Sequence, residues 1–169
     1  MNVDSNNLIE ALRAHLKASP FWMQKLARHG NGSLGLHLAI FREPYLTFLM
    51  EGRKTVETRF AKRYCPPFGR VGSGDVLLLK QSGGPIMGVC TVEQVWFYEI
   101  DASSLKLIKE KFGRAICPVD NSFWSERKNS VCATLMLVDN VTPVSNIVIQ
   151  KRDRRGWVII QDANQRELL

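Results

Sequence analysis

The strand-like segments of this chain follow one another mostly through short turns, not through helices. DVLLLK (75–80) and PIMGVCTVEQVWFYEI (85–100) are separated only by QSGG, a hairpin-type turn. Other strand patterns are LHLAIF (36–41), KTVETR (54–59), VCATLMLVDNVTPV (131–144) and GWVII (156–160). About five to seven strands without regular strand–helix alternation predict an α+β fold, in which a mixed or antiparallel sheet closes towards a barrel and helices pack at its ends.

Helical patterns flank and interrupt these strands. Leu8, Leu12 and Leu16 recur at helical spacing within residues 5–29, where Pro20 breaks the pattern. RHGNGSLG (28–35) then has the composition of a loop. We therefore predict an N-terminal helical extension over residues 1–33 and a main domain over residues 34–169. If the leucine stripe is exposed, it offers a surface for a protein partner or for self-association.

Two shorter helices are predicted inside the main domain. REPYLTFLMEG (42–52) carries Pro44 where a first helical turn accepts proline and Gly52 just past the expected end. DASSLKLIKEKFG (101–113) begins with Asp101 or Ser103 as the N-cap and is expected to stop at Gly113.

The bulk composition fits one globular domain with a polyanionic partner. The net charge of +7 over 169 residues favours RNA or DNA first and acidic membrane surfaces second. No apolar run has the length that spans a bilayer, and the N-terminus lacks the pattern of a secretory signal, so we expect a cytoplasmic protein without a membrane partner. The four cysteines form no C-x-x-C pair and have no histidine at ligand spacing, so no metal site is predicted.

The most polar of the predicted strands lies in GRKTVETR (52–59). Alternation places Val56 on one face and Glu57 with Arg59 on the other. Lys54 falls on the Val56 face by strict counting, but it directly follows a turn, where alternation is least reliable. The spacing alone favours a surface ion pair between Glu57 and Arg59 over a functional site. Together with Lys54, however, the two would form a site that accepts protons and binds phosphate.

Two further segments combine basic and aromatic residues. KRDRRGW (151–157) places Arg152, Arg154 and Arg155 before Trp157. The arginines are equally consistent with nucleic-acid binding and with a solvated turn, whereas Trp157 is assigned to the core. FWSERKN (123–129) offers Trp124 either as a stacking platform or as an aromatic that closes one end of the barrel.

No cofactor is predicted from the motifs. GRVGSGD (69–75) approaches the spacing of a dinucleotide-binding loop, but it precedes a strand instead of a helix. It therefore has no helix N-terminus to bind a pyrophosphate and is interpreted as a turn.

The order of these pieces resembles that of the ASCH domain family. The matching pattern is an apolar strand, a Pro-aromatic helix and then G-x-K-x-x-E-x-R, here Gly52, Lys54, Glu57 and Arg59, followed by the pair Gly74–Asp75 and an apolar strand. The resemblance covers roughly residues 35–160 and implies a PUA-like β-barrel. It also implies RNA or nucleotide binding in a cleft between barrel and helix. On this basis Lys54, Glu57 and Arg59 are the candidate catalytic or pocket residues, beside Pro44 and Tyr45, with Lys80 and Ser82 as further binding candidates.

Whether such a protein binds its ligand or also turns it over is left open. A branch of the family hydrolyses N4-acetylcytidine with a lysine matching Lys54 and a threonine at the position of Glu57, so this chain lacks that threonine unless Thr55 or Thr58 replaces it. Other members resemble ribonucleases. The first hypothesis is therefore a module that binds RNA or a nucleotide, and the alternative is a metal-independent ribonuclease or an amidohydrolase. The binding hypothesis predicts that Glu57→Ala and Arg59→Ala abolish ligand binding with little loss of fold.

Overall fold

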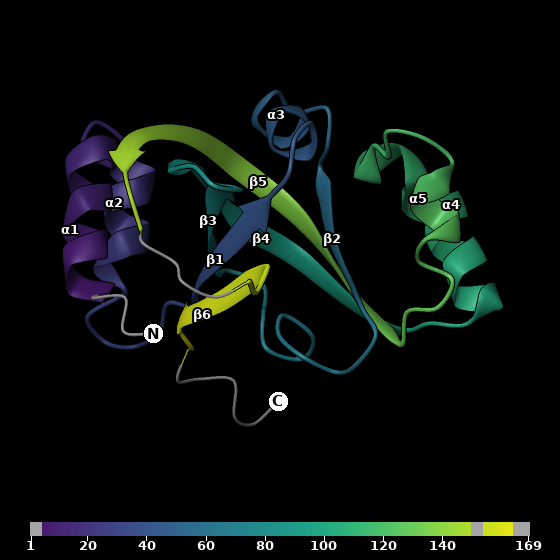
Figure 1. The fold of residues 1–169 in the computed structure, drawn as a ribbon. Coiled ribbons are helices and arrows are strands. Elements are labelled where there is room, and N and C mark those ends of the chain that lie inside the picture. Colours follow the sequence, from purple (N-terminus) through teal and green to yellow (C-terminus); the bar gives the residue numbers. More distant parts are fainter. Residues whose placement is uncertain (1–4, 150–153, 164–169) are drawn as a thin grey trace.

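The computed structural model describes residues 5–149 and 154–163 and contains a strongly curled sheet with helices at both ends (Figure 1). The sheet has six strands in the order β2-β5-β4-β3-β1-β6. Their bounds are β1 (Leu36–Phe41), β2 (Val56–Ala61), β3 (Val76–Gln81), β4 (Ile86–Glu99), β5 (Cys132–Ile147) and β6 (Trp157–Gln161). The helices are α1 (Ser5–Leu16), α2 (Pro20–Ala27), α3 (Tyr45–Met50), α4 (Ala102–Ile116) and α5 (Ser122–Ser125).

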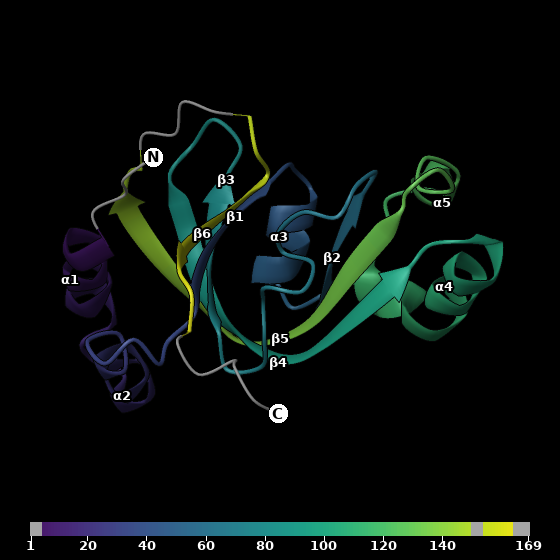
Figure 2. The same ribbon diagram turned by 90° about the horizontal axis from the view of Figure 1, so that it is seen from below.

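The sheet is mixed and forms an open half-barrel. Strands β1 and β3 pair in parallel, whereas the other neighbouring strands are antiparallel. The long strands β4 and β5 bend through the whole molecule and carry the curl (Figure 2). Strands β2 and β6 are the two edges. The predicted α+β class, with a mixed sheet curling towards a barrel and flanking helices, is confirmed.

Helices α1 and α2 cover one end of the sheet. Leu8, Leu12 and Leu16 are buried in a core cluster that also contains Leu36 of β1 and Val76 of β3. The indole Nε1 of Trp22 in α2 donates to the Thr142 hydroxyl of β5 at 2.8 Å. The leucine stripe is therefore not an exposed surface for self-association, because the sheet itself covers it.

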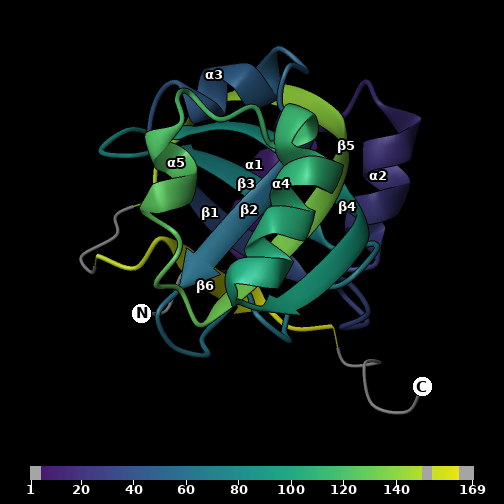
Figure 3. The ribbon, with the colours of Figure 1, turned by 90° about the vertical axis from the view of Figure 1, so that its right-hand side faces the viewer.

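Helix α4 packs at the other end and extends further than the sequence indicates. Asp101 is the N-cap and forms a capping box with Ser104, as the sequence predicts. The helix does not stop at Gly113 but continues to Ile116, and Cys117 ends it in the left-handed conformation with φ of 55°. The extra turn places Ile116 in the core, at helical spacing from Phe112. Figure 3 shows α4 and the short α5 beside β2.

Candidate functional site

Strand β2 places the polar motif at an open edge of the half-barrel. Gly52 adopts φ of +74° directly after α3, which turns the chain back towards the sheet. Val56 then enters the core formed with α4 and α5. Glu57 projects to the opposite face of the strand. The curled sheet encloses its side chain there, and only 4% of the residue's surface is exposed.

Lys54, Glu57 and Arg59 form one buried network. Glu57 Oε2 lies 3.3 Å from Lys54 Nζ, and Glu57 Oε1 lies 2.8 Å from Arg59 Nε. The N–H of Arg59 Nε is not aligned with this oxygen, so the second contact is an ion pair rather than a hydrogen bond. The Glu57–Arg59 pair exists, but it is not the surface pair that spacing alone favours.

Lys54 reaches Glu57 because it precedes the strand and does not follow its alternation. Its ammonium also donates to the carbonyls of Val56 at 2.9 Å and Ile116 at 3.1 Å, so three acceptors surround it. Burial lowers the pKa of Lys54, and the nearby Glu57 carboxylate opposes part of that effect. The helix end at Ile116, which sequence reasoning did not extend so far, supplies one of these acceptors.

Arg59 bridges the opening of the half-barrel. Its Nη1 donates to the carbonyls of Ile40 and Gly156, both at 3.1 Å, and thereby links β2 to β1 and to the start of β6. The guanidinium carbon lies 4.9 Å from the ring centre of Phe41 and 5.4 Å from that of Trp157. These contacts fix the orientation of the side chain, which remains 19% exposed.

A cleft of about 1390 Å³ opens above this network. The predicted residues that line it are Pro44, Tyr45, Lys54, Glu57, Arg59, Lys80, Ser82, Arg154 and Arg155. Lys80 is buried at its rim and donates to the carbonyls of Gln81 and Gly84, while Ser82 is exposed on the β3–β4 turn. Arg154 and Arg155 are exposed on the approach to β6. Arg152 lies outside the described residues.

Trp124 is not part of this cleft. It is only 8% exposed and packs at 4.9 Å, edge to face, against Phe123 in the core between α4, α5 and β2. It therefore closes the end of the half-barrel and is not available as a stacking platform. The lining residues that sequence reasoning missed include Arg42, Lys62, Phe123 and Arg127. Arg42 and Lys62 flank the recognised motifs closely, and Phe123 and Arg127 lie inside the aromatic and basic segment 123–129.

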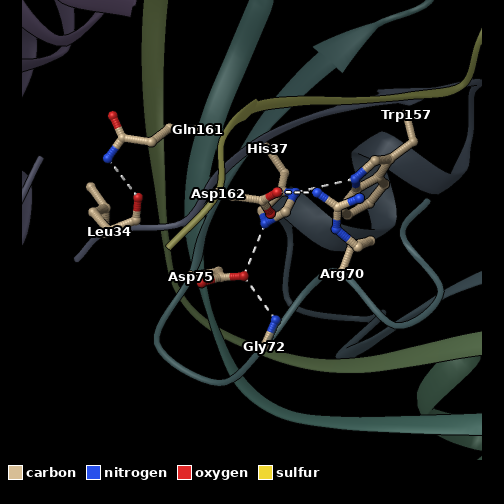
Figure 4. A network of polar contacts seen from close by, with 8 residues as sticks. All are labelled: Leu34, His37, Arg70, Gly72, Asp75, Trp157, Gln161 and Asp162. Atoms are coloured by element: carbon tan, nitrogen blue, oxygen red, sulfur yellow. Dashed lines mark hydrogen bonds and ion pairs between the residues drawn. The ribbon is translucent and has the colours of Figure 1, made fainter. Parts of the chain in front are cut away.

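A second polar network supports the site from the far side of Trp157 (Figure 4). The Trp157 indole donates to His37 Nδ1 at 3.3 Å, and His37 Nε2 lies 2.9 Å from Asp75 Oδ2. Because the indole nitrogen is a donor only, the imidazole carries its proton on Nε2 and donates it to Asp75. Asp75 Oδ2 also accepts from the backbone N–H of Gly72 at 2.8 Å. The aspartate of the Gly–Asp pair before β3 thus holds, through His37, the ring against which Arg59 packs.

This half-barrel, with a Lys–Glu–Arg network at its open edge, defines a PUA-like domain. Comparison with known protein families identifies the family within this class. The model of the ASCH domain matches residues 40–142. The chain therefore belongs to the ASCH domain family, whose PUA-like members often bind RNA. No curated protein matches the chain.

Solved structures of low sequence identity share the fold. The ASCH protein of Zymomonas mobilis is 13% identical, with a TM-score of 0.58 over 75% of this chain and 87% of that chain. A serine-to-alanine variant of ZmASCH from the same organism is 14% identical, with a TM-score of 0.51 over 64% of this chain and 70% of that chain. A tyrosine-to-phenylalanine variant is 15% identical, with a TM-score of 0.51 over 65% of this chain and 73% of that chain.

Residues 5–149 and 154–163 contain neither a metal-binding cluster nor a membrane span. Within these ranges, no three or more His, Cys, Asp or Glu side chains are grouped so that they could hold a metal ion. Over the same part of the chain, no helix combines the length and the apolar character that crossing a bilayer requires.

Proposed function

We propose that the cleft binds single-stranded nucleic acid, with RNA as the preferred ligand. The observation that carries the proposal is the charge of the lining: among its described residues, cationic side chains outnumber carboxylates by eight to four. The cations are Arg42, Lys54, Arg59, Lys62, Lys80, Arg127, Arg154 and Arg155, and the carboxylates are Glu43, Glu57, Asp120 and Glu126. Such an excess attracts phosphates and releases their counterions on binding.

The size of the cleft favours a polymer over a single nucleotide. Its volume of about 1390 Å³ exceeds the roughly 300–1,000 Å³ of most small-molecule pockets. Tyr45, which is partly exposed, adds an aromatic ring to the wall of the cleft. Aromatic side chains of this kind stack on bases of any sequence.

The buried network supports a binding role because its groups are already fixed. Lys54 has three acceptors, and Arg59 is held by Glu57 and two carbonyls. Because these side chains are already ordered, ligand binding avoids the entropic cost of ordering them. The binding unit in this proposal is residues 34–169, which contain all the described lining residues. In the proposed extension over residues 1–33, helices α1 and α2 pack at the other end of the sheet.

The affinity of the protein for a short single-stranded RNA is expected to fall steeply with salt. Fluorescence anisotropy between about 50 and 200 mM salt measures the slope of log K against log salt, to which each neutralised phosphate contributes about 0.7. Arg154→Ser, at an exposed lining residue, is expected to make the slope shallower by about that amount.

Lys17→Ser is the matched control, because Lys17 is exposed directly after α1 and does not line the cleft. Its slope should equal that of the unmodified protein. The binding proposal is wrong if the RNA does not bind, or if both variants change the slope equally.

A hydrolase acting on a modified nucleoside is the second candidate, and the lowered pKa of Lys54 favours it. A lysine that deprotonates more readily is a better general base. In hydrolysis of N4-acetylcytidine, the base takes a proton from water and the oxygen adds to the acetyl carbon. The C–N bond then breaks, the proton passes to the departing nitrogen, and acetate and cytidine leave. Thr58 lines the cleft, whereas Thr55 is exposed and does not line it, so this candidate assigns the threonine role to Thr58.

Incubation with N4-acetylcytidine and with RNA, followed by chromatography, tests for turnover. The hydrolase candidate predicts acetate release or RNA fragments that a Lys54→Arg variant does not form, because arginine stays charged. If the unmodified protein and the Lys54→Arg variant form equal amounts of product, Lys54 takes no part in the reaction. If neither forms product, binding remains the proposed function.

A further inference from the structure

Along one edge, strand β2 presents a row of peptide groups to the cleft. Among the described strands it pairs with β5 alone, because it is the last strand of the sheet. The register places Glu57 opposite Met136 and Arg59 opposite Thr134. Its other edge faces the cleft, where Thr58 and Phe60 are lining residues.

The hydrogen-bond pattern identifies which residues point outward. In an antiparallel pair, opposed residues alternate between hydrogen-bonded and non-hydrogen-bonded positions. The Val138 N–H donates to the Thr55 carbonyl at 3.0 Å, so Thr55 is a bonded position. Glu57 and Arg59 share its parity and bond to β5, whereas Val56, Thr58 and Phe60 direct their N–H and C=O groups away from it.

Val56 provides independent support for this assignment. Its carbonyl accepts a 2.9 Å hydrogen bond from Lys54 Nζ, as expected of a carbonyl that is directed away from β5. Lys54 therefore already occupies the first outward carbonyl of the edge, that of Val56. Within residues 5–149 and 154–163, no side chain or backbone group bonds to the outward peptide groups of Thr58 or Phe60.

We propose that the outward N–H and C=O of Thr58 read the edge of one nucleobase in the cleft, with the Phe60 peptide group continuing the same row. This inference rests on the proposed nucleic-acid function and names its base-reading element. In an extended residue the N–H and C=O point the same way, so they offer a donor and an acceptor side by side. A base edge that carries an acceptor next to a donor satisfies both groups at once.

The charge of the cleft favours a nucleic acid over an extended peptide as the ligand at this strand edge. An extended peptide also pairs with an open strand edge. The described lining residues, however, include twice as many cations as carboxylates, and a polyanionic backbone matches this charge better than a peptide of mixed charge does. The phosphates then lie along the arginine-rich walls while one base turns towards β2.

Amide hydrogen exchange followed by NMR tests the proposal, with the strand as its own control. In the free protein, the amides of Thr58 and Phe60 should exchange much faster than those of Glu57 and Arg59, which bond to β5. Addition of a short single-stranded RNA should slow exchange at Thr58 by about tenfold, the factor that corresponds to about 1.4 kcal/mol. An abasic ribose-phosphate oligomer of the same length should bind without this effect.

A pair of variants tests the same donor by affinity. Thr58→Pro removes the outward N–H, and an edge strand accepts proline where its N–H faces away from the sheet. Thr58→Val keeps the peptide group and loses only the hydroxyl. Proline is expected to weaken RNA binding about tenfold relative to valine, with affinity for the abasic oligomer unchanged.

The outcomes separate this inference from the function on which it rests. RNA binding without slower exchange at Thr58 would overturn the strand-edge assignment and leave the binding function intact. Slower exchange with an acidic extended peptide, and none with RNA, would also overturn it. Absence of binding by both RNA and the abasic oligomer would instead refute the proposed function. The exchange experiment decides the matter even if the proline variant fails to fold.

Discussion

Replacement of Lys54 by methionine is expected to lower the free energy of unfolding by about 3–5 kcal/mol. Lys54 is only 3% exposed, and its ammonium joins the Glu57 carboxylate to two backbone carbonyls. Methionine fills a similar volume but donates no hydrogen bond. The substitution therefore leaves the buried Glu57 carboxylate with Arg59 as its remaining cation in the network. It also leaves the two backbone carbonyls without their hydrogen-bond donor. Urea unfolding followed by circular dichroism measures the decrease in stability.

Lys62→Met is the matched control, since Lys62 is exposed and lies one residue beyond the same strand. Its effect should stay within about 0.5 kcal/mol. A double variant, Lys54→Met with Glu57→Gln, should lose less than the sum of the two single variants by about 0.5–3 kcal/mol, because the uncompensated carboxylate is gone. A decrease below about 1 kcal/mol for Lys54→Met alone would mean that the network does not hold the fold together.

The second large effect is expected for Gly35→Ala, which should lower the free energy of unfolding by about 3 kcal/mol through overpacking and disruption of a buried hydrogen bond. A Cβ at Gly35 would lie 2.1 Å from Asp75 Oδ1 and 2.4 Å from Asp75 Cγ. Asp75 is buried and holds both His37 and the Gly72 N–H, so it has little freedom to retreat. Thermal or urea unfolding measures the change.

Gly30→Ala serves as the comparison, because a Cβ there meets no atom within 4 Å. Its stability should stay within about 0.5 kcal/mol of the unmodified protein. If Gly35→Ala is equally well tolerated, the close approach between Gly35 and Asp75 does not constrain the fold.

The burial of the network changes how the site must be tested. Sequence reasoning expects alanine at Glu57 or Arg59 to remove binding with little loss of fold. Glu57 is in fact enclosed between two cations, and Arg59 ties β2 to the carbonyls of Ile40 and Gly156. Either alanine variant would lose stability together with binding. Exposed lining residues such as Arg154 separate the two effects.

Local patterns predicted most of the secondary structure because they depend on neighbours in the chain. Asp101 caps α4, as predicted, through a side chain that accepts from the backbone N–H of Ser104 in the first turn. The predicted end of α4 was wrong by three residues. Gly113 is tolerated inside the helix because the packing of Phe112 and Ile116 against β2 outweighs its low propensity.

The sequence by itself determined the α+β class, the strands and the motif residues, since periodicity and spacing are written in the order of the chain. It also placed Lys54, Glu57 and Arg59 close together, because they fall within six residues. Only the tertiary structure decided that this cluster is buried and that Trp124 is core.

Only the tertiary structure also brought distant segments to the network. Ile116 lies 62 residues from Lys54 in the chain, and Gly156 lies 97 residues from Arg59, yet both carbonyls accept hydrogen bonds from these side chains. The curl of the sheet and the packing of α4 make these contacts. Burial and strand-edge exposure depend on which strands pair, and that long-range choice has no local signature.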